Sequence, residues 1–134
     1  MVLGMLLLVG CQSTPVSYPA LTEQIAAGET VSPVALREAF LAADDHAERM
    51  ERLAELEVQA YAILEDEPLK LGSLGTAILD TYYGSLTGHY VLARFYRHLE
   101  NEQAALEHEA WIARIQAGMM VEHDGKDSAE RAAD

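Results

Sequence analysis

Apolar residues recur at intervals of three and four along most of this chain, and this spacing constrains the fold more than any other feature. In one stretch they fall at Met50, Leu53, Leu56, Ala60 and Leu64. The interval matches the 3.6-residue turn of an α-helix, so each such stretch has one apolar side that must be buried. No stretch shows convincing two-residue alternation, which is typical of a half-buried strand. We therefore predict an all-α protein.

Proline, glycine and capping residues divide the periodic sequence into six predicted helices. The first opens at Pro19 and stops at Gly28, and the second has Ser32 as its N-cap and Pro33 at its first position. The later boundaries fall at Asp45, Pro68, Gly84, Ser85 and Asn101.

Local signals make specific predictions at three of these boundaries. Asp45 and Glu48 have the spacing of a capping box at the start of the third helix. We expect Gly84 to end the fourth helix in a left-handed conformation and Ser85 to cap the fifth. Asn101 is expected both to end the fifth helix and to cap the sixth.

Small residues gather on the predicted fourth helix. Gly72, Gly75 and Thr76 lie close together there. Small side chains let two helix backbones approach each other closely. We therefore expect a neighbouring helix to pack against this place.

The predicted sixth helix is apolar on two adjoining sides. One side carries Ala104, His108, Trp111, Ile115 and Met119, and the other carries Leu106, Ala110, Ala113 and Ala117. We therefore expect this helix to be well packed on both sides. Apolar periodicity ends after Val121, so residues 122–134 are predicted to be a polar loop and tail.

Short turns between helices produce antiparallel hairpins, which either stack into a short solenoid or close into a compact helical bundle. The span 90–115, YVLARFYRHLENEQAALEHEAWIARI, resembles one tetratricopeptide-type unit. Leu92, Ala93 and Tyr96 match the large, small and aromatic positions of its first helix, and Ala105 matches the small residue of its second. The turn departs from the pattern because Glu100 replaces the usual glycine. The fold is thus predicted to be either tetratricopeptide-like or a bundle.

The end of the chain is also similar to an uncharacterised family of secreted bacterial proteins. In that family a helical hairpin with a histidine in its second helix leads into a Gly-Asp-Gly-Lys-Ser loop. Here His108 takes the histidine position and Asp124, Gly125 and Lys126 take the loop, whereas His123 departs from it. The resemblance implies a helical hairpin and leaves the function blank, since the family has no assigned activity.

The chain is strongly acidic, with 22 acidic and 9 basic residues and a formal charge of -13 at pH 7. This charge repels nucleic-acid phosphates and anionic lipid headgroups, so neither is an expected partner. A basic partner stays open.

The first eleven residues, MVLGMLLLVGC, combine an apolar run with the only cysteine of the chain. The run is too short to span a bilayer, which needs about 20 residues. Leu8, Val9, Gly10 and Cys11 resemble the lipobox of bacterial lipoproteins. The resemblance implies cleavage before Cys11 and acylation of its thiol with palmitate-like chains, which tether a protein to a membrane. The absence of Lys or Arg before Arg37 departs from the usual export signal.

These features predict four segments. Residues 1–10 are the lipoprotein signal peptide, and residues 11–19 are the lipidated cysteine and an extended tether. Residues 20–121 are the helical domain, and residues 122–134 are the polar loop and tail. Gln12 follows the cysteine, so the lipoprotein resemblance implies the periplasmic face of the outer membrane.

Five histidines raise a metal hypothesis, because neutral imidazole is a common ligand. His89, His98 and His108 follow one another at nine and ten residues, so no pair has the interval that places two ligands on one helix face. A core histidine with one hydrogen bond explains His108 better than a ligand does. We predict no metal site and no cofactor.

No catalytic constellation stands out in the sequence. Ser85 and His89 are close together but lack the Gly-x-Ser-x-Gly elbow of hydrolases, and helix capping explains Ser85 better. No phosphate-binding glycine loop is present. The chain is therefore predicted not to be an enzyme.

Tyrosine and arginine gather in the second half of the chain, and both are side chains that protein interfaces favour. The predicted interaction surface consists of Tyr82, Tyr83, Tyr90, Arg94 and Arg97. The alternative is that two or three of the tyrosines pack inward with their hydroxyls at the surface. The leading hypothesis is a lipid-anchored, non-catalytic module that binds an envelope protein or a peptide. The alternatives are a periplasmic ligand-binding or metal-binding protein that uses the histidines, and a purely structural envelope component.

Overall fold

The computed structural model describes residues 14–131, with side chains as far as Lys126. In this part of the chain there are six α-helices, one 3-10 helix and no strand, so the all-α prediction is confirmed. The elements are α1 (Tyr18–Ala26), α2 (Pro33–Leu41), α3 (His46–Ile63), η1 (Pro68–Lys70), α4 (Leu71–Thr81), α5 (Leu86–His98) and α6 (Glu102–Arg131). The predicted signal peptide and Cys11 lie outside the described residues.

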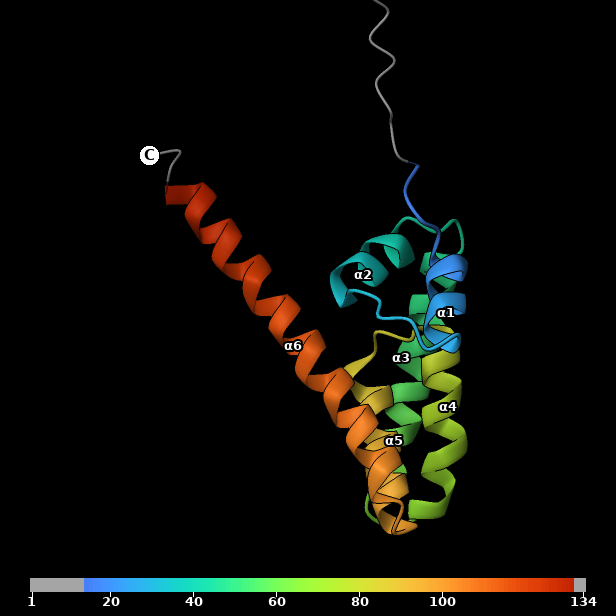
Figure 1. The fold of residues 1–134 in the computed structure, drawn as a ribbon. Helices are drawn as coiled ribbons and strands as arrows, with labels where there is room; N and C mark the ends of the chain where they lie inside the picture. The colour runs from blue at the N-terminus through green and yellow to red at the C-terminus, as the bar shows by residue number, and fades with distance from the viewer. Residues whose placement is uncertain (1–13, 132–134) are drawn as a thin grey trace, which may run out of the picture.

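The helices form a bundle, with α3, α4 and α5 side by side and the short α1 and α2 at one end (Figure 1). Helix α6 packs against α5 over its first half and then leans away from the body of the bundle (Figure 1). Its second half contacts α2. The structure is consistent with the compact helical bundle, which is one of the two predicted architectures. The tetratricopeptide-like stacking stays a prediction.

Two apolar clusters make up the core. The first lies between α3, α4 and α5 and contains Leu53, Leu56, Ala60, Leu71, Ile78 and Val91. The second belongs mainly to the N-terminal helices and contains Tyr18, Leu21, Val31, Leu36 and Phe40. Tyr82, just after α4, packs against both clusters, with its ring centre 4.3 Å from that of Phe40. This side chain therefore joins the N-terminal helices to the body.

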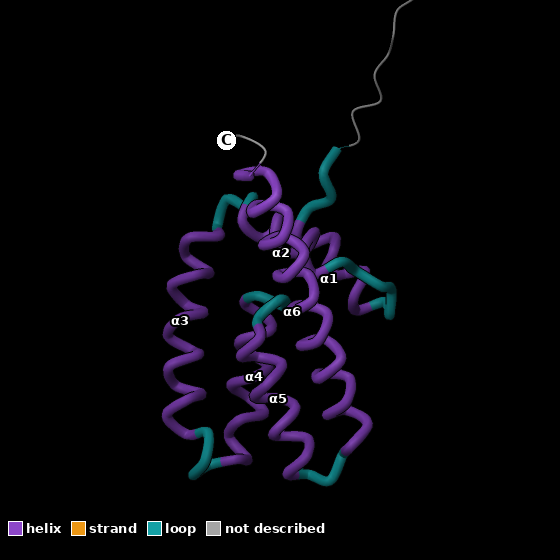
Figure 2. Tube along the Cα trace, turned by 90° about the vertical axis from the view of Figure 1, so that its left-hand side faces the viewer, coloured by secondary structure: helices purple, strands orange, loops and turns teal. Residues whose placement is uncertain are grey.

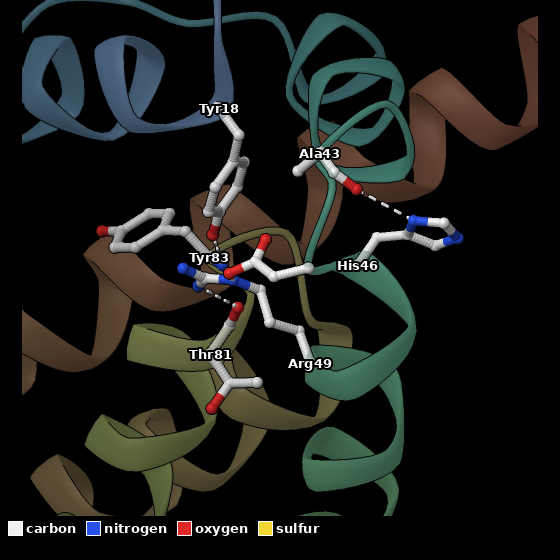
Figure 3. Close-up of polar contacts among 7 residues, drawn as sticks. Tyr18, Ala43, His46, Arg49, Thr81 and Tyr83 are labelled. Atoms are coloured by element: carbon white, nitrogen blue, oxygen red, sulfur yellow. Dashed lines mark hydrogen bonds and ion pairs between the residues drawn. The ribbon is translucent and has the colours of Figure 1, made fainter.

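Polar contacts around Arg49 make a second connection to the N-terminal helices (Figure 3). The Arg49 guanidinium lies 5.6 Å from the ring centre of Tyr18 and donates to the Thr81 carbonyl at 3.2 Å. The Tyr18 hydroxyl accepts a hydrogen bond from the backbone N–H of Tyr83 at 2.9 Å. Tyr18 is only 4% exposed, so it belongs to the domain. The predicted tether, which ended at Pro19, is therefore too long, because Ser17 already caps α1.

Most of the predicted helix boundaries are confirmed. Ser32 and Ser85 accept hydrogen bonds from the first turns of α2 and α5, and Asn101 accepts one from Ala104 in α6. Gly28 has a φ of 79° and ends α1 as expected. These signals succeed because a cap and its helix are adjacent in the sequence.

Two predicted boundary details are wrong. The Asp45 side chain makes no capping hydrogen bond, because its carboxylate accepts from Arg49 Nε at 2.7 Å. Gly84 is not left-handed, since α4 has already ended at Thr81 and Tyr82 is extended. In both cases a contact with another side chain or another part of the core replaces the local signal.

The turn between α5 and α6 holds Glu100 at a φ of 58°, in the left-handed region. The backbone N–H groups of Glu100 and Asn101 donate to the Arg97 and Tyr96 carbonyls at 3.0 and 2.9 Å, which is the Schellman pattern of helix ends. Glycine usually occupies this position in the tetratricopeptide pattern. Here the left-handed position is occupied by a residue with a side chain, which has a steric cost there.

Helix α6 is longer than predicted. It continues to Arg131, so the expected loop and tail from residue 122 are helical as far as the structure describes them. The loop that the secreted family implied at Asp124, Gly125 and Lys126 is also absent. Glu, Lys, Ala and Arg favour helices, and one glycine costs only about 1 kcal/mol once a helix has formed. Glu122 is also paired with Arg37 of α2.

The second apolar side of α6 is exposed, which contradicts the expectation that both sides are packed. Leu106, Ala110, Ala113 and Ala117 all face solvent. Helix α6 contacts α5 with its first half and α2 with its second, and these neighbours cover only one of its sides. The apolar pattern alone could not show how many neighbours the helix would have.

The predicted close approach of two helices occurs between α4 and α5. A Cβ atom added to Gly75 would lie 2.6 Å from Cγ of Leu92, and one added to Gly72 would lie 2.6 Å from the ring of Phe95. Both distances are far below a van der Waals contact. The two glycines therefore allow the close contact between α4 and α5, which lies beside the first apolar cluster.

Gly75→Ala is expected to lower the free energy of unfolding by about 1–3 kcal/mol, because its Cβ would overpack the α4–α5 contact. Gly125→Ala is the control, since a Cβ at Gly125 in α6 meets nothing within 4 Å. The control should be more stable than wild type by up to about 1 kcal/mol. Urea denaturation measures both changes, and an unchanged Gly75→Ala protein would contradict the close packing.

Candidate functional site

Two histidines meet between α5 and α6. His89 is 0% exposed, and its Nδ1 lies 3.0 Å from Nδ1 of His108. Its Nε2 lies 2.8 Å from the carbonyl oxygen of Tyr83, in the turn between α4 and α5. The third candidate of the sequence, His98, is exposed near the end of α5. The pair therefore links α6 to α5 and to the preceding turn.

The Tyr83 carbonyl determines where the protons of the pair lie. A carbonyl oxygen only accepts, so Nε2 of His89 carries a hydrogen and donates to it. Nδ1 of neutral His89 then has a lone pair, which accepts from Nδ1–H of His108. Nε2 of neutral His108 keeps its own lone pair. No described side-chain nitrogen is both buried and unpartnered, so this atom reaches solvent.

Aromatic rings surround the histidine pair. Trp111 stacks on His89 with ring centres 5.4 Å apart, and Tyr96 stacks on His108 at 5.6 Å. Tyr83 packs edge-on against His89 at 5.2 Å. Burial among these rings lowers the pKa of His89 to about 4 and also lowers the pKa of His108. Both side chains are therefore neutral at pH 7. The hydrogen bond between them requires this of His89, because Nδ1 of His89 is the acceptor.

The pair offers little for metal binding. The two Nδ1 atoms bond each other and Nε2 of His89 bonds a carbonyl, so a single nitrogen remains open. Among residues 14–126, whose side chains the structure describes, no three His, Cys, Asp or Glu side chains are grouped so that they could hold a metal ion. The histidine pair is therefore a hydrogen-bonded contact between α5 and α6, with one open imidazole nitrogen at its outer end.

Acid should weaken the contact between His89 and His108. The unfolded chain protonates His89 near pH 6.5, whereas the folded chain does so only near pH 4. Stability from neutral His89 is therefore complete above about pH 6.5 and is lost as the pH falls toward 4, by on the order of 3 kcal/mol. Urea denaturation at pH 7 and pH 4.5 measures the change. Between these pH values the free energy of unfolding should fall less in His89→Gln than in wild type.

His98→Gln is the matched control for this measurement, because it removes an exposed histidine from the same helix. It should retain the wild-type dependence on pH. Equal pH dependence in His89→Gln and wild type would show that His89 is not held neutral in the folded protein.

A groove of about 250 Å³ lies between α6 and the rest of the bundle. Its apolar lining comes from four helices and consists of Val34, Leu53, Leu86, Ile115 and Met119. The turn between α4 and α5 also lines it, through Tyr82, Gly84 and Ser85. Helices α3 and α6 lie on opposite sides of this turn (Figure 2). The lean of α6 therefore leaves an apolar recess open where the elements converge.

Charged groups stand at the edges of the groove. Arg37 of α2 pairs with Glu122 of α6, and both line the groove. Glu57 of α3 lines it as well and accepts a hydrogen bond from the Ser85 hydroxyl at 3.0 Å. One guanidinium thus faces two carboxylates, and the groove is negative.

Exposed aromatic residues continue from the groove along α3 and α5. The Tyr61 hydroxyl lies 3.3 Å from Oγ1 of Thr87, which itself lines the groove. Tyr90 is exposed on α5, and Arg94 donates to its hydroxyl and pairs with Glu65 beyond α3. The apolar recess is therefore bordered by side chains that are common in interfaces.

The five residues of the predicted interaction surface do not form one patch. Tyr82 lines the groove, whereas Tyr83 points inward beside the histidine pair. Tyr90 and Arg94 are close together next to α3, and Arg97 pairs with Glu102 and Glu109 of α6. The turn at Tyr82 and Tyr83 directs their rings into the core.

Sequence reasoning missed most of the groove. Leu53 and Ile115 were expected only as core residues, and Leu86 and Glu57 were not singled out. No motif marks the groove, because its lining comes from α2, α3, α5, α6 and a turn. One signal in the sequence could have indicated the groove. Met119 ends the apolar side of the long last helix, further along than the shorter α5 can cover.

No protein family, curated protein or solved structure was found to match this chain. Within residues 14–131 no helix is both long enough and apolar enough to cross a membrane. The function must therefore be argued from the histidine pair, the groove and the charge of the chain.

Proposed function

We propose that this chain is a cell-envelope lipoprotein whose helical domain is a non-catalytic module for binding another protein or a peptide. The observation that carries the proposal is the open groove beside α6, with an apolar floor and charged edges. Acylation at Cys11 and a location on the periplasmic face of the outer membrane are part of the same proposal. They rest on the lipobox resemblance of residues 8–11.

The shape and chemistry of the groove support a binding role. Its volume of about 250 Å³ suits one large apolar side chain of a partner. Met119 is 50% exposed at its wall, and methionine adapts easily to differently shaped partners. Burying apolar surface is favourable by about 25 cal/mol per Å². A purely structural component would therefore be more stable with this recess filled, whereas a binding module keeps it open for a partner.

Met119→Lys is expected to reduce partner capture in the native envelope about tenfold, because it places a charge at the groove wall. Met120→Lys is the control, since Met120 is 66% exposed and does not line the groove. In-cell crosslinking followed by quantitative mass spectrometry measures the capture. Equal capture by the two variants, or no specific capture by wild type, would contradict a groove-binding function and favour a structural role.

Cys11→Ser is expected to abolish membrane association, because it removes the thiol that would carry the lipid. Intact-mass measurement of the wild-type protein should fit cleavage before residue 11 plus acyl chains, and fractionation should find it with the outer membrane. An uncleaved wild-type protein outside the membrane fraction would refute the lipoprotein part of the proposal while leaving the groove untouched.

A ligand-binding or metal-binding role for the histidines is the second candidate. The observation that favours it is the open Nε2 of His108 at the outer end of the pair. A zinc or copper ion bound there would raise the melting temperature of wild type but not of His108→Gln. Melting curves that do not change with added Zn²⁺ or Cu²⁺ would exclude this role.

A further inference from the structure

We infer that the partner of the groove is a basic amphipathic segment of another protein, which inserts an apolar side chain beside Ile115 and Met119 and places a Lys or Arg against Glu57. The inference rests on the proposed binding function and adds the chemistry of the partner. Three observations carry it: where the cations of the chain are used, what surrounds Glu57, and which aromatic residues border the groove.

The cations of this chain are largely committed to internal contacts. Among the described residues, five of them pair with carboxylates of the same chain: Arg37, Arg49, Lys70, Arg94 and Arg97. Arg114 donates to the Val31 carbonyl and lies 4.4 Å from the ring centre of Trp111. The excess of 13 negative charges therefore remains largely for other molecules to neutralise.

Among the described residues no cation pairs with Glu57, the second carboxylate of the groove. Its described polar contact is the hydrogen bond from Ser85, whereas Glu122 is paired with Arg37. A carboxylate can accept about four hydrogen bonds, so most of its capacity is open. Leu53 lines the groove one turn away on the same helix. An apolar side chain and a cation of one partner segment can therefore bind side by side.

Tyr61 extends this site, because it lies four residues after Glu57 on the same side of α3. Its ring is exposed, and its hydroxyl is held near Thr87 of α5. Exposed tyrosine rings attract Lys and Arg through cation–π contacts. A second copy of this chain is a poor occupant, since each copy carries a formal charge of -13. The charge and the aromatic border both favour a basic partner.

The test uses the full chain and two helical peptides with leucines at identical positions, one with lysine and one with glutamate at every remaining position. Fluorescence anisotropy should show binding of the lysine peptide and none of the glutamate peptide. Glu57→Gln, which keeps the hydrogen-bond acceptor for Ser85, should weaken lysine-peptide binding about fivefold. Glu55→Gln is the control, because Glu55 is exposed on the same helix and does not line the groove.

Methyl NMR of the methionines locates the peptide. The Met119 signal should shift on addition of the lysine peptide, whereas Met120, the neighbouring residue that does not line the groove, should shift much less. The inference is overturned if the two peptides bind alike, if the lysine peptide does not bind, or if the two glutamine variants weaken binding equally. If the peptide test fails but Met119→Lys still loses crosslinked partners, the proposed binding function stands. If the crosslinked segment of the partner is acidic or neutral, only the inference of a basic partner is rejected.

Discussion

The buried ring of His89 is the contact on which the position of α6 depends. It donates to the Tyr83 carbonyl, accepts from His108 and stacks on Trp111. These contacts join α5, α6 and the turn after α4, and the hydrogen bond accepted from His108 requires a neutral imidazole. Burial holds the ring in this neutral form. The start of α6 is therefore attached to the bundle by a polar contact that water cannot replace.

The groove is a consequence of how the rest of α6 is supported. The second half of the helix leans away from the bundle (Figure 1). Two contacts hold it there, from Arg114 to the Val31 carbonyl and from Glu122 to Arg37. Arg37 and Glu122 both line the groove, so this pair connects α6 to α2 beside the apolar recess and leaves the recess open. The same structure that secures the helix thus provides the surface we propose for binding.

Predictions from sequence succeeded where the determining contact is local. Ser85 and Asn101 cap their helices because the groups they bond are three residues away. The prediction for Gly75 also succeeded, since small residues indicate a close approach whichever helix makes it. Predictions failed where another contact competed with the expected one, as when Arg49, four residues on, took the Asp45 carboxylate that was expected to cap α3. The end of α6 was misplaced for a different reason, because loss of apolar periodicity indicates exposure and not loss of helix.

The sequence by itself determined the all-α class, most of the helix boundaries and the acidic character of the chain, because periodicity, capping and charge are properties of neighbouring residues. Only the tertiary structure decided that His89 meets His108, that Glu57 borders an apolar groove, and that one side of α6 remains bare. The histidine pair joins residues 19 positions apart, and the Arg37–Glu122 pair at the groove joins residues 85 positions apart. Such contacts depend on the angles at which helices pack, and a single helix carries no record of the angle its neighbour adopts.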